Sequence, residues 1–247
     1  MRPLFLPFVA VLLSLLASWS GAEEKKPTRA VAQAEFDRTD AALNTAWTAA
    51  KKTLSEGEFA SLKESQKHWL DHRDRLARSP VFTGESTRDG GDLPLDSPAY
   101  LKAAASLTDM RTEWLRGYVT RAEDAPTGVW TDSYGGTIEI VARDGVLHFI
   151  ATCVRGPSSH LGELAGVGTW NETIGWFSDK GRDQTKAEET NLSFVLRDRT
   201  LELIGANTSH YHGARAYFDG LYVRTKSLSA KEQAHVVSQA KTGASGQ

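Results

Sequence analysis

The first half of the chain repeats apolar residues at helical spacing. Between residues 30 and 121 they recur three, four or seven positions apart, which places them on one face of a helix. A loop over residues 79–97, rich in Gly, Pro and Asp, separates the second and third repeats. The three stripes are Phe36, Leu43, Trp47, Ala50 and Leu54; then Phe59, Leu62, Gln66, Trp69, Arg73 and Leu76; then Leu101, Ala104, Leu107, Arg111, Trp114 and Tyr118.

Capping signals indicate where two of these helices begin. Ser55 precedes Glu58 by three positions, which is the spacing of a capping box. Ser97 and Pro98 open the third helix, because Ser is a favoured cap and Pro is favoured in the first turn. The tight first connection predicts an antiparallel hairpin of two helices with the third packed across it, a three-helix hairpin-type bundle.

The second half alternates apolar and polar residues, as strands with one buried face do. Asp144-Gly145 is a hairpin turn signal between two of these segments. We therefore expect an antiparallel β domain over residues 128–226, a sandwich or a small barrel, after a linker at residues 122–127. Residues 227–247 are expected to form a short helix and a disordered tail. The expected strands are 128–133, 137–142, 146–154, 162–170, 174–178, 192–196, 201–205 and 215–223.

The two halves together predict the α+β fold class. Acidic and basic residues nearly cancel, to a formal net charge of −2, which argues against a nucleic-acid partner. The single cysteine, Cys153, excludes an internal disulfide and a Cys-cluster zinc site. Its flanks predict a strand, so we expect a buried and inert thiol, with pairing between molecules as the alternative.

The beginning of the chain has the pattern of a secretory signal peptide. Arg2 precedes an apolar run over residues 4–16, and Ser20 and Ala22 stand at the −3 and −1 positions of a cleavage site. The run is shorter than the about 20 residues that span a bilayer, although an uncleaved anchor is the alternative. We therefore expect removal of residues 1–22, a periplasmic or secreted location, and no membrane association afterwards.

Three polar residues interrupt the apolar stripes at positions that should be buried: Gln66, Arg73 and Arg111. An unpaired guanidinium is costly to bury, so each arginine requires a partner or must extend to solvent. Candidate partners are Asp40, Asn44 and Asp109. The pattern predicts a buried polar network that fixes how the helices fit together. The alternative is a polar binding groove formed by Gln66, Trp69, Arg73, Arg111 and Asn44.

Three motifs follow one another through the predicted helices. They are Asp40-x-x-Leu43-Asn44, then Gln66-x-x-Trp69-x-x-His72-Arg73-Asp74, then Thr108-x-x-Arg111. In this order they resemble the family of secreted helical domains named for the LprI-type lysozyme inhibitor, over residues 28–121. The resemblance implies a protein that binds a lysozyme-type enzyme or another envelope protein. Ala77 stands where family members place a cysteine, so core packing must hold the helices without the family's disulfide.

Two histidines in the second half are candidates for metal binding. His210 and His212 would point the same way from a strand and could share one ion. His160 and Glu163 precede another strand and could complete the site. This arrangement would suit a metal-dependent hydrolase. No G-x-S-x-G or phosphate-loop motif occurs, so enzyme activity has no positive support and no cofactor is expected.

The sequence therefore leaves three functional hypotheses. The first is an exported, non-enzymatic binding protein that inhibits a lysozyme (muramidase) by occluding its cleft, with residues 80–96 as the contact because long loops often carry function. The second is an envelope module that binds a small molecule or glycan through aromatic side chains of the β domain. The third is the hydrolase. The aromatic candidates are Trp130, Trp170, Trp176, Tyr211, Tyr217 and Tyr222.

Overall fold

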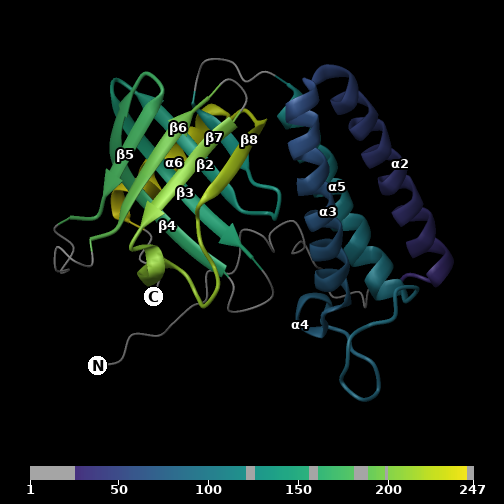
Figure 1. Cartoon of the computed structure of the whole chain (residues 1–247). Helices are drawn as coiled ribbons and strands as arrows, with labels where there is room; N and C mark the ends of the chain where they lie inside the picture. Colours follow the sequence, from purple (N-terminus) through teal and green to yellow (C-terminus); the bar gives the residue numbers. More distant parts are fainter. Residues whose placement is uncertain (1–25, 121–125, 156–160, 181–188, 198–199, 244–247) are drawn as a thin grey trace, which may run out of the picture.

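A computed structural model describes residues 26–120, 126–155, 161–180, 189–197 and 200–243. A group of helices comes first and a β-barrel follows, so the predicted α+β class is confirmed (Figure 1). The expected signal peptide at residues 1–22 lies outside the described residues. The first helices are α2 (Arg29–Thr53), α3 (Glu56–Arg78), α4 (Pro80–Thr83) and α5 (Pro98–Val119).

Side-chain caps start the three long helices of this part. Thr28 caps α2 and Ser97 caps α5, with Pro98 in its first turn. At α3 the capping box predicted from Ser55 and Glu58 is confirmed: the Ser55 hydroxyl accepts from the Glu58 amide, and the Glu58 carboxylate accepts from the Ser55 amide at 2.8 Å. Each cap satisfies amides that the first helical turn leaves unpaired.

The helices pack differently from the predicted hairpin detail, which is not confirmed. The closest pair is α2 and α5, and α3 packs on α5 rather than mainly on α2. Buried alanines on both partners allow this close approach, namely Ala46, Ala50, Ala104 and Ala105. Ala32 shares one core cluster with Leu101, and Ala50 shares another with Leu115, so α2 and α5 run in the same direction.

The segment over residues 79–97 is not entirely a loop, which corrects the prediction. It begins with the single turn α4, where Pro80 occupies a first-turn position that its fixed φ suits. Gly84, at φ 72°, ends the turn in the left-handed conformation. The rest of the segment, to Ser97, has no regular secondary structure.

The second part is a closed barrel in which each strand is antiparallel to its neighbours and β1 pairs with β8. Of the two predicted architectures, the small barrel is therefore the one observed. Closure leaves no unpaired sheet edge. The strands are β1 (Gly128–Thr131), β2 (Thr137–Arg143), β3 (Val146–Val154), β4 (Leu161–Asn171), β5 (Ile174–Ser178), β6 (Asn191–Leu196), β7 (Thr200–Ala206) and β8 (Gly220–Lys226).

Alternate residues of the strands fill the barrel interior. An eight-stranded barrel is just wide enough for side chains to fill it. Aromatic rings stabilise the centre of the barrel through edge-to-face and tilted contacts. The ring of Phe149, for example, lies 5.0 Å from those of Phe177 and Phe194, measured between centroids. The largest fully buried interior side chains are Trp130, Ile138, Ile140, Leu147, Phe149, Leu164, Leu192, Phe194, Phe218 and Tyr222.

The last strand starts later than expected: β8 covers Gly220–Lys226, whereas the sequence predicted residues 215–223. The preceding segment forms the 3-10 helix η1 (Thr208–Tyr211) and one isolated β-bridge, between His212 and Gly162 of β4. The chain then contributes Ala216 and Phe218 to the barrel core without forming a strand. The apolar residues that indicated a strand are therefore buried because they pack into the barrel core, not because they belong to a strand. Burial alone does not distinguish a strand from a segment that covers the core.

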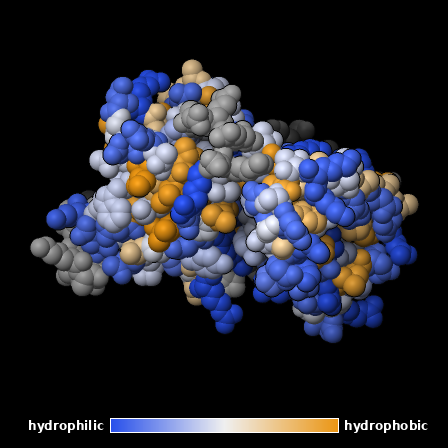
Figure 2. All heavy atoms as spheres, turned by 45° about the horizontal axis from the view of Figure 1, so that its top comes forward, coloured by the Kyte–Doolittle hydropathy of each residue, from blue (hydrophilic) through white to orange (hydrophobic). Residues whose placement is uncertain are grey.

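A final helix, α6 (Ala230–Thr242), lies against the outside of β2, β3 and β4 (Figure 1). Its Val236 is fully buried with Leu228 and with Val141 of β2. Elsewhere the barrel exterior keeps apolar side chains in solvent, and Figure 2 shows apolar patches interspersed with polar ones on both parts of the molecule. Apolar atoms on a surface are normal in small proteins.

The helical part and the barrel meet where α5 lies against β8. Val223 of β8 belongs to the same core cluster as Trp114 and Leu115 of α5. Gly117 makes the closest approach, because a Cβ atom there would stand 2.8 Å from the Arg224 carbonyl oxygen. The absence of a side chain at this position therefore permits the contact.

Candidate functional site

Arg111 is the most buried charged residue among those described, at 1% exposure. Its Nε donates to Gln66 Oε1 at 2.9 Å and its Nη2 donates to Ser65 Oγ at 3.2 Å. The guanidinium also lies over the rings of Trp114, at 4.2 Å, and Trp69, at 5.5 Å. All four partners are neutral, so no negative charge compensates this cation within the helices.

Arg73 lies two turns from Gln66 on the same helix, but its hydrogen-bond partners differ from those of Arg111. Its guanidinium donates to Asp74 Oδ1 at 2.8 Å, and the Tyr100 hydroxyl donates to the same oxygen at 2.9 Å. Burial, together with Asp74, raises the pKa of Tyr100 to about 12. The Arg73 guanidinium lies over Trp69 at 5.4 Å, so this indole interacts with two arginines. The predicted buried polar network is therefore present around Trp69.

The partners predicted for the arginines are wrong. Asn44 donates to Asp40 at 3.0 Å on the exposed surface of α2, and Asp109 is exposed. The arginines instead use side chains of α3, because α3 faces the side of α5 that carries Arg111. The structure thus brings Gln66, Trp69, Arg73 and Arg111 together and leaves Asn44 outside the group.

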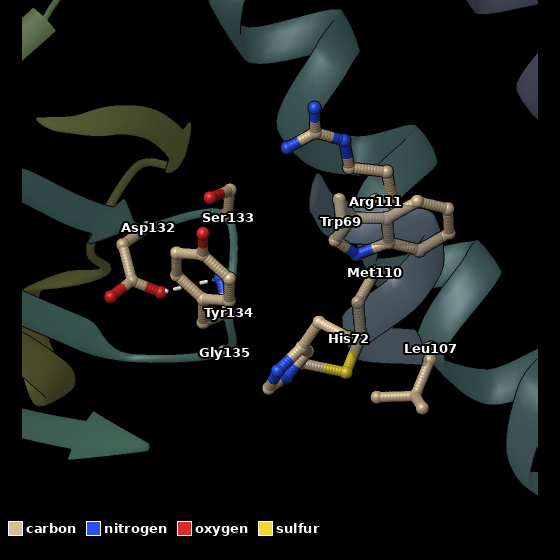
Figure 3. Close-up of a pocket in the computed structure, with 9 residues that line it drawn as sticks. All are labelled: Trp69, His72, Leu107, Met110, Arg111, Asp132, Ser133, Tyr134 and Gly135. Carbon is tan, nitrogen blue, oxygen red and sulfur yellow. Dashed lines mark hydrogen bonds between the residues drawn. The ribbon is translucent and has the colours of Figure 1, made fainter. Parts of the chain in front are cut away.

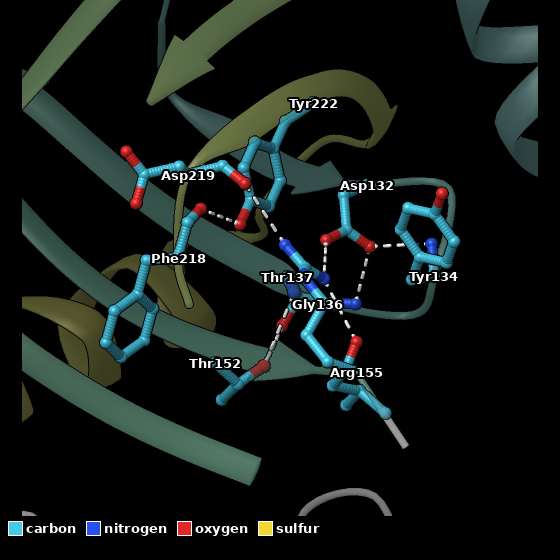
Figure 4. A network of polar contacts seen from close by, with 10 residues as sticks. Asp132, Tyr134, Gly136, Thr137, Thr152, Arg155, Phe218, Asp219 and Tyr222 are labelled. Carbon is cyan, nitrogen blue, oxygen red and sulfur yellow. Dashed lines mark hydrogen bonds and ion pairs between the residues drawn. The ribbon is translucent and has the colours of Figure 1, made fainter. Parts of the chain in front are cut away.

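A turn of the barrel completes this region. Between β1 and β2, the Asp132 carboxylate accepts from the amides of Tyr134, at 2.8 Å, and Gly136, at 2.7 Å, and forms an ion pair with Arg155. Arg155 Nη2 also donates to the Asp219 carbonyl at 3.2 Å (Figure 4). This network fixes the turn, so that Tyr134 projects toward the helices.

A cavity of about 10 Å³ lies where this turn meets α3 and α5 (Figure 3). The ring of His72 meets the ring of Tyr134 edge-on, at 5.0 Å between centroids. Burial, with smaller contributions from Arg75 and Arg155, lowers the pKa of His72 to about 4, so the imidazole is neutral at pH 7. The cavity is lined by Trp69, His72, Leu107, Met110, Arg111, Asp132, Ser133, Tyr134 and Gly135.

Sequence reasoning missed His72 and Tyr134 as members of this site. The segment Tyr134-Gly135-Gly136 shows a turn, but no local signal indicates that the turn packs on helices more than 20 residues away. The buried position of His72 could have been predicted, because His72 belongs to the motif Gln66-x-x-Trp69-x-x-His72-Arg73-Asp74 and stands directly before the inward-facing Arg73.

The histidine pair does not have the predicted geometry. His210 lies in η1, so it and His212 do not share one side of a strand. His212 Nδ1 contacts the Gly213 carbonyl and its Nε2 contacts the Thr208 hydroxyl, both at 3.0 Å, so both ring nitrogens have protein partners. Glu163 lies on β4, and His160 is outside the described residues. Among the described residues no group of three or more His, Cys, Asp or Glu side chains could hold a metal ion.

The aromatic candidates of the barrel do not gather on one face. Trp130, Tyr211 and Tyr222 are buried in the barrel core, and Trp170 is half-buried, with its indole donating to the Glu172 carbonyl. Two of the six remain substantially exposed, Trp176 at 49% and Tyr217 at 46%. Most of these aromatics therefore serve packing.

The segment between α3 and α5 presents apolar side chains to solvent. Val81 is 63% exposed, Phe82 41% and Leu95 56%. Arg78 holds the base of the segment, because its Nε and its carbonyl both bond to the backbone of buried Leu93, at 3.0 and 2.9 Å. The exposed side chains therefore stand on an anchored loop.

This loop is also acidic. Residues 80–96 contain four carboxylates and one arginine, a formal charge of −3. Two of the carboxylates connect the loop to the start of the helical part, through Lys26–Glu85 at 3.0 Å and Arg29–Asp96 at 3.3 Å. The other acidic groups, Asp89 and Asp92, have no ion pair among the described residues.

Comparison with known proteins identifies the helical part. Residues 19–115 match the family model described as Lysozyme inhibitor LprI. No curated protein and no solved structure matches the chain. None of the helices within the described residues combines the length and apolar character that crossing a bilayer requires.

Proposed function

Because residues 19–115 match the family model described as Lysozyme inhibitor LprI, we propose that this chain is an exported, non-enzymatic protein that binds a lysozyme-type muramidase and occludes its cleft. The observation that carries the proposal is the anchored loop with Val81, Phe82 and Leu95 in solvent. In this proposal residues 1–22 are removed on export, and residues 28–121 form the inhibitory domain.

The exposed apolar side chains, the anchored base and the negative charge of the loop suit a segment that enters an enzyme cleft. Apolar side chains that already stand in solvent gain free energy when an enzyme cleft covers them. The loop is fixed at its base by Arg78 and Leu93, so less conformational entropy is lost on binding than a free loop would lose. Its charge of −3 complements the basic surface that lysozymes commonly carry.

The test is lysozyme activity on a peptidoglycan suspension, with and without the purified protein lacking residues 1–22. We expect dose-dependent inhibition by the unaltered sequence. A double variant, Phe82→Ser with Leu95→Ser, should raise the inhibition constant at least about tenfold, because each substitution removes roughly 1 kcal/mol of apolar burial.

A matched control changes two equally exposed apolar side chains of the barrel, Ile174 at 53% and Ile204 at 50%, to serine. This control should inhibit as strongly as the unaltered protein. Absence of inhibition at high micromolar excess would refute the proposed function. Loss of inhibition in the barrel variant alone would refute the loop as the contact.

A further inference from the structure

The helices leave one side of the barrel exterior uncovered. Around the closed barrel, α6 lies against β2, β3 and β4, and α5 lies against β8 (Figure 1). The outer surface of β5, β6 and β7 therefore faces solvent, and we call it, with one flanking residue on each side, the β5–β7 face. Its large apolar side chains are each between 40% and 53% exposed, namely Val167, Ile174, Trp176, Ile204 and Leu221.

These apolar side chains are neighbours across the strands. Trp176 of β5 is paired with Ser193 of β6, which is paired with Ile204 of β7. The next row of paired residues has Ile174 at one end and Leu221 at the other. Apolar side chains scattered singly over a surface are ordinary. A contiguous patch on the order of 400 Å², as here, has the size of those that often mark an interaction site.

The β5–β7 face carries no unbalanced charge. Glu202 is the one ionised side chain at the outward positions of these three strands, all of which the structure describes. Arg197 neutralises it, with Nη2 at 2.9 Å from the carboxylate. In a two-fold symmetric contact the same surface meets itself, so a charged face would repel its own copy. This face would not be repelled.

We propose that two copies of this chain associate through the β5–β7 face as a two-fold symmetric dimer. Two sheets pack face to face when their apolar side chains interdigitate, and the exposed rows on both copies allow this. A basic or an acidic partner, by contrast, would find no unpaired charge to complement on this face. A barrel surface is convex, so the contact is small, and we expect a dissociation constant on the order of 10–100 µM.

The test is sedimentation velocity of the protein lacking residues 1–22, between about 1 and 300 µM. We expect monomer at the lowest concentration and mostly dimer at the highest. Ile174→Ser with Ile204→Ser should raise the dissociation constant at least about a hundredfold, because a symmetric contact contains each substitution twice. This variant should therefore stay monomeric throughout. An unaltered protein that is monomeric at every concentration would overturn the proposal.

The matched control is Phe82→Ser with Leu95→Ser, which removes two similarly exposed apolar side chains from the helical part. It should form the dimer as the unaltered protein does. Dimer formation that survives in the barrel variant, or that is lost in this control, would overturn the β5–β7 face as the contact. Lysozyme inhibition is measured separately on the same two variants. The barrel variant should be monomeric and still inhibit, so the dimer and the proposed function can fail independently.

Discussion

The contact between α5 and β8 can be tested with one added methyl group. In Gly117→Ala the new Cβ would stand 2.8 Å from the Arg224 carbonyl oxygen and 3.0 Å from Val223 Cγ2. Neither neighbour can move freely, since the first is backbone and the second belongs to a fully buried residue. Overpacking of this kind costs about 1–3 kcal/mol. Alanine recovers about 0.5–1 kcal/mol through its better helix propensity, so we expect a net loss of roughly 1–2 kcal/mol.

Gly57→Ala is the matched control. Gly57 also lies in a helix, but a Cβ there would meet nothing within 4 Å. The control should therefore be neutral or stabilising by up to about 1 kcal/mol. The two variants should differ by about 2 kcal/mol, or roughly 4–8 °C in melting temperature.

Urea unfolding followed by tryptophan fluorescence measures both variants, because Trp69 and Trp114 report on the helices and Trp130 reports on the barrel. The unfolding of the helices should respond to Gly117→Ala at least as strongly as that of the barrel. Equal stability of the two alanine variants would refute the reasoning, because α5 could not then lie against β8 as described.

Three further predictions concern buried ionisable groups. Asp132→Asn leaves Arg155 buried without its counter-charge and should cost about 3–5 kcal/mol in urea unfolding, whereas Glu202→Gln, at an exposed ion pair, should cost at most about 1 kcal/mol. The folded-state pKa of His72 is about 4, below its unfolded value of 6.5, so the unfolded chain binds more protons between these values. Stability should therefore fall as pH drops from 6.5 to 4, by at most about 3 kcal/mol, and His72→Phe should flatten this profile. Burial raises the pKa of Cys153 to about 11, so this thiol should stay unreactive toward an aromatic disulfide reagent until urea unfolds the barrel.

Local features of the fold could be predicted from the sequence. Ser55 and Ser97 indicated where helices begin, and alternation within the β half indicated most of its strands. These signals act within a few residues, because a cap bonds to the next turn and alternation reflects which side of one strand is buried. The inward positions of Arg73 and Arg111 were evident for the same reason, since helical periodicity assigns a face to each residue.

Long-range contacts required the tertiary structure. The identity of the partners of Arg111 depended on which face of α3 packs on α5, and the closure of the barrel depended on β1 meeting β8 almost 100 residues later. Nothing in the sequence of the turn at Tyr134 indicates which helices the turn contacts. Such contacts depend on packing between elements remote in the chain, which residue spacing along one segment does not encode. The neutral surroundings of Arg111 are therefore visible only once α3 and α5 are packed together.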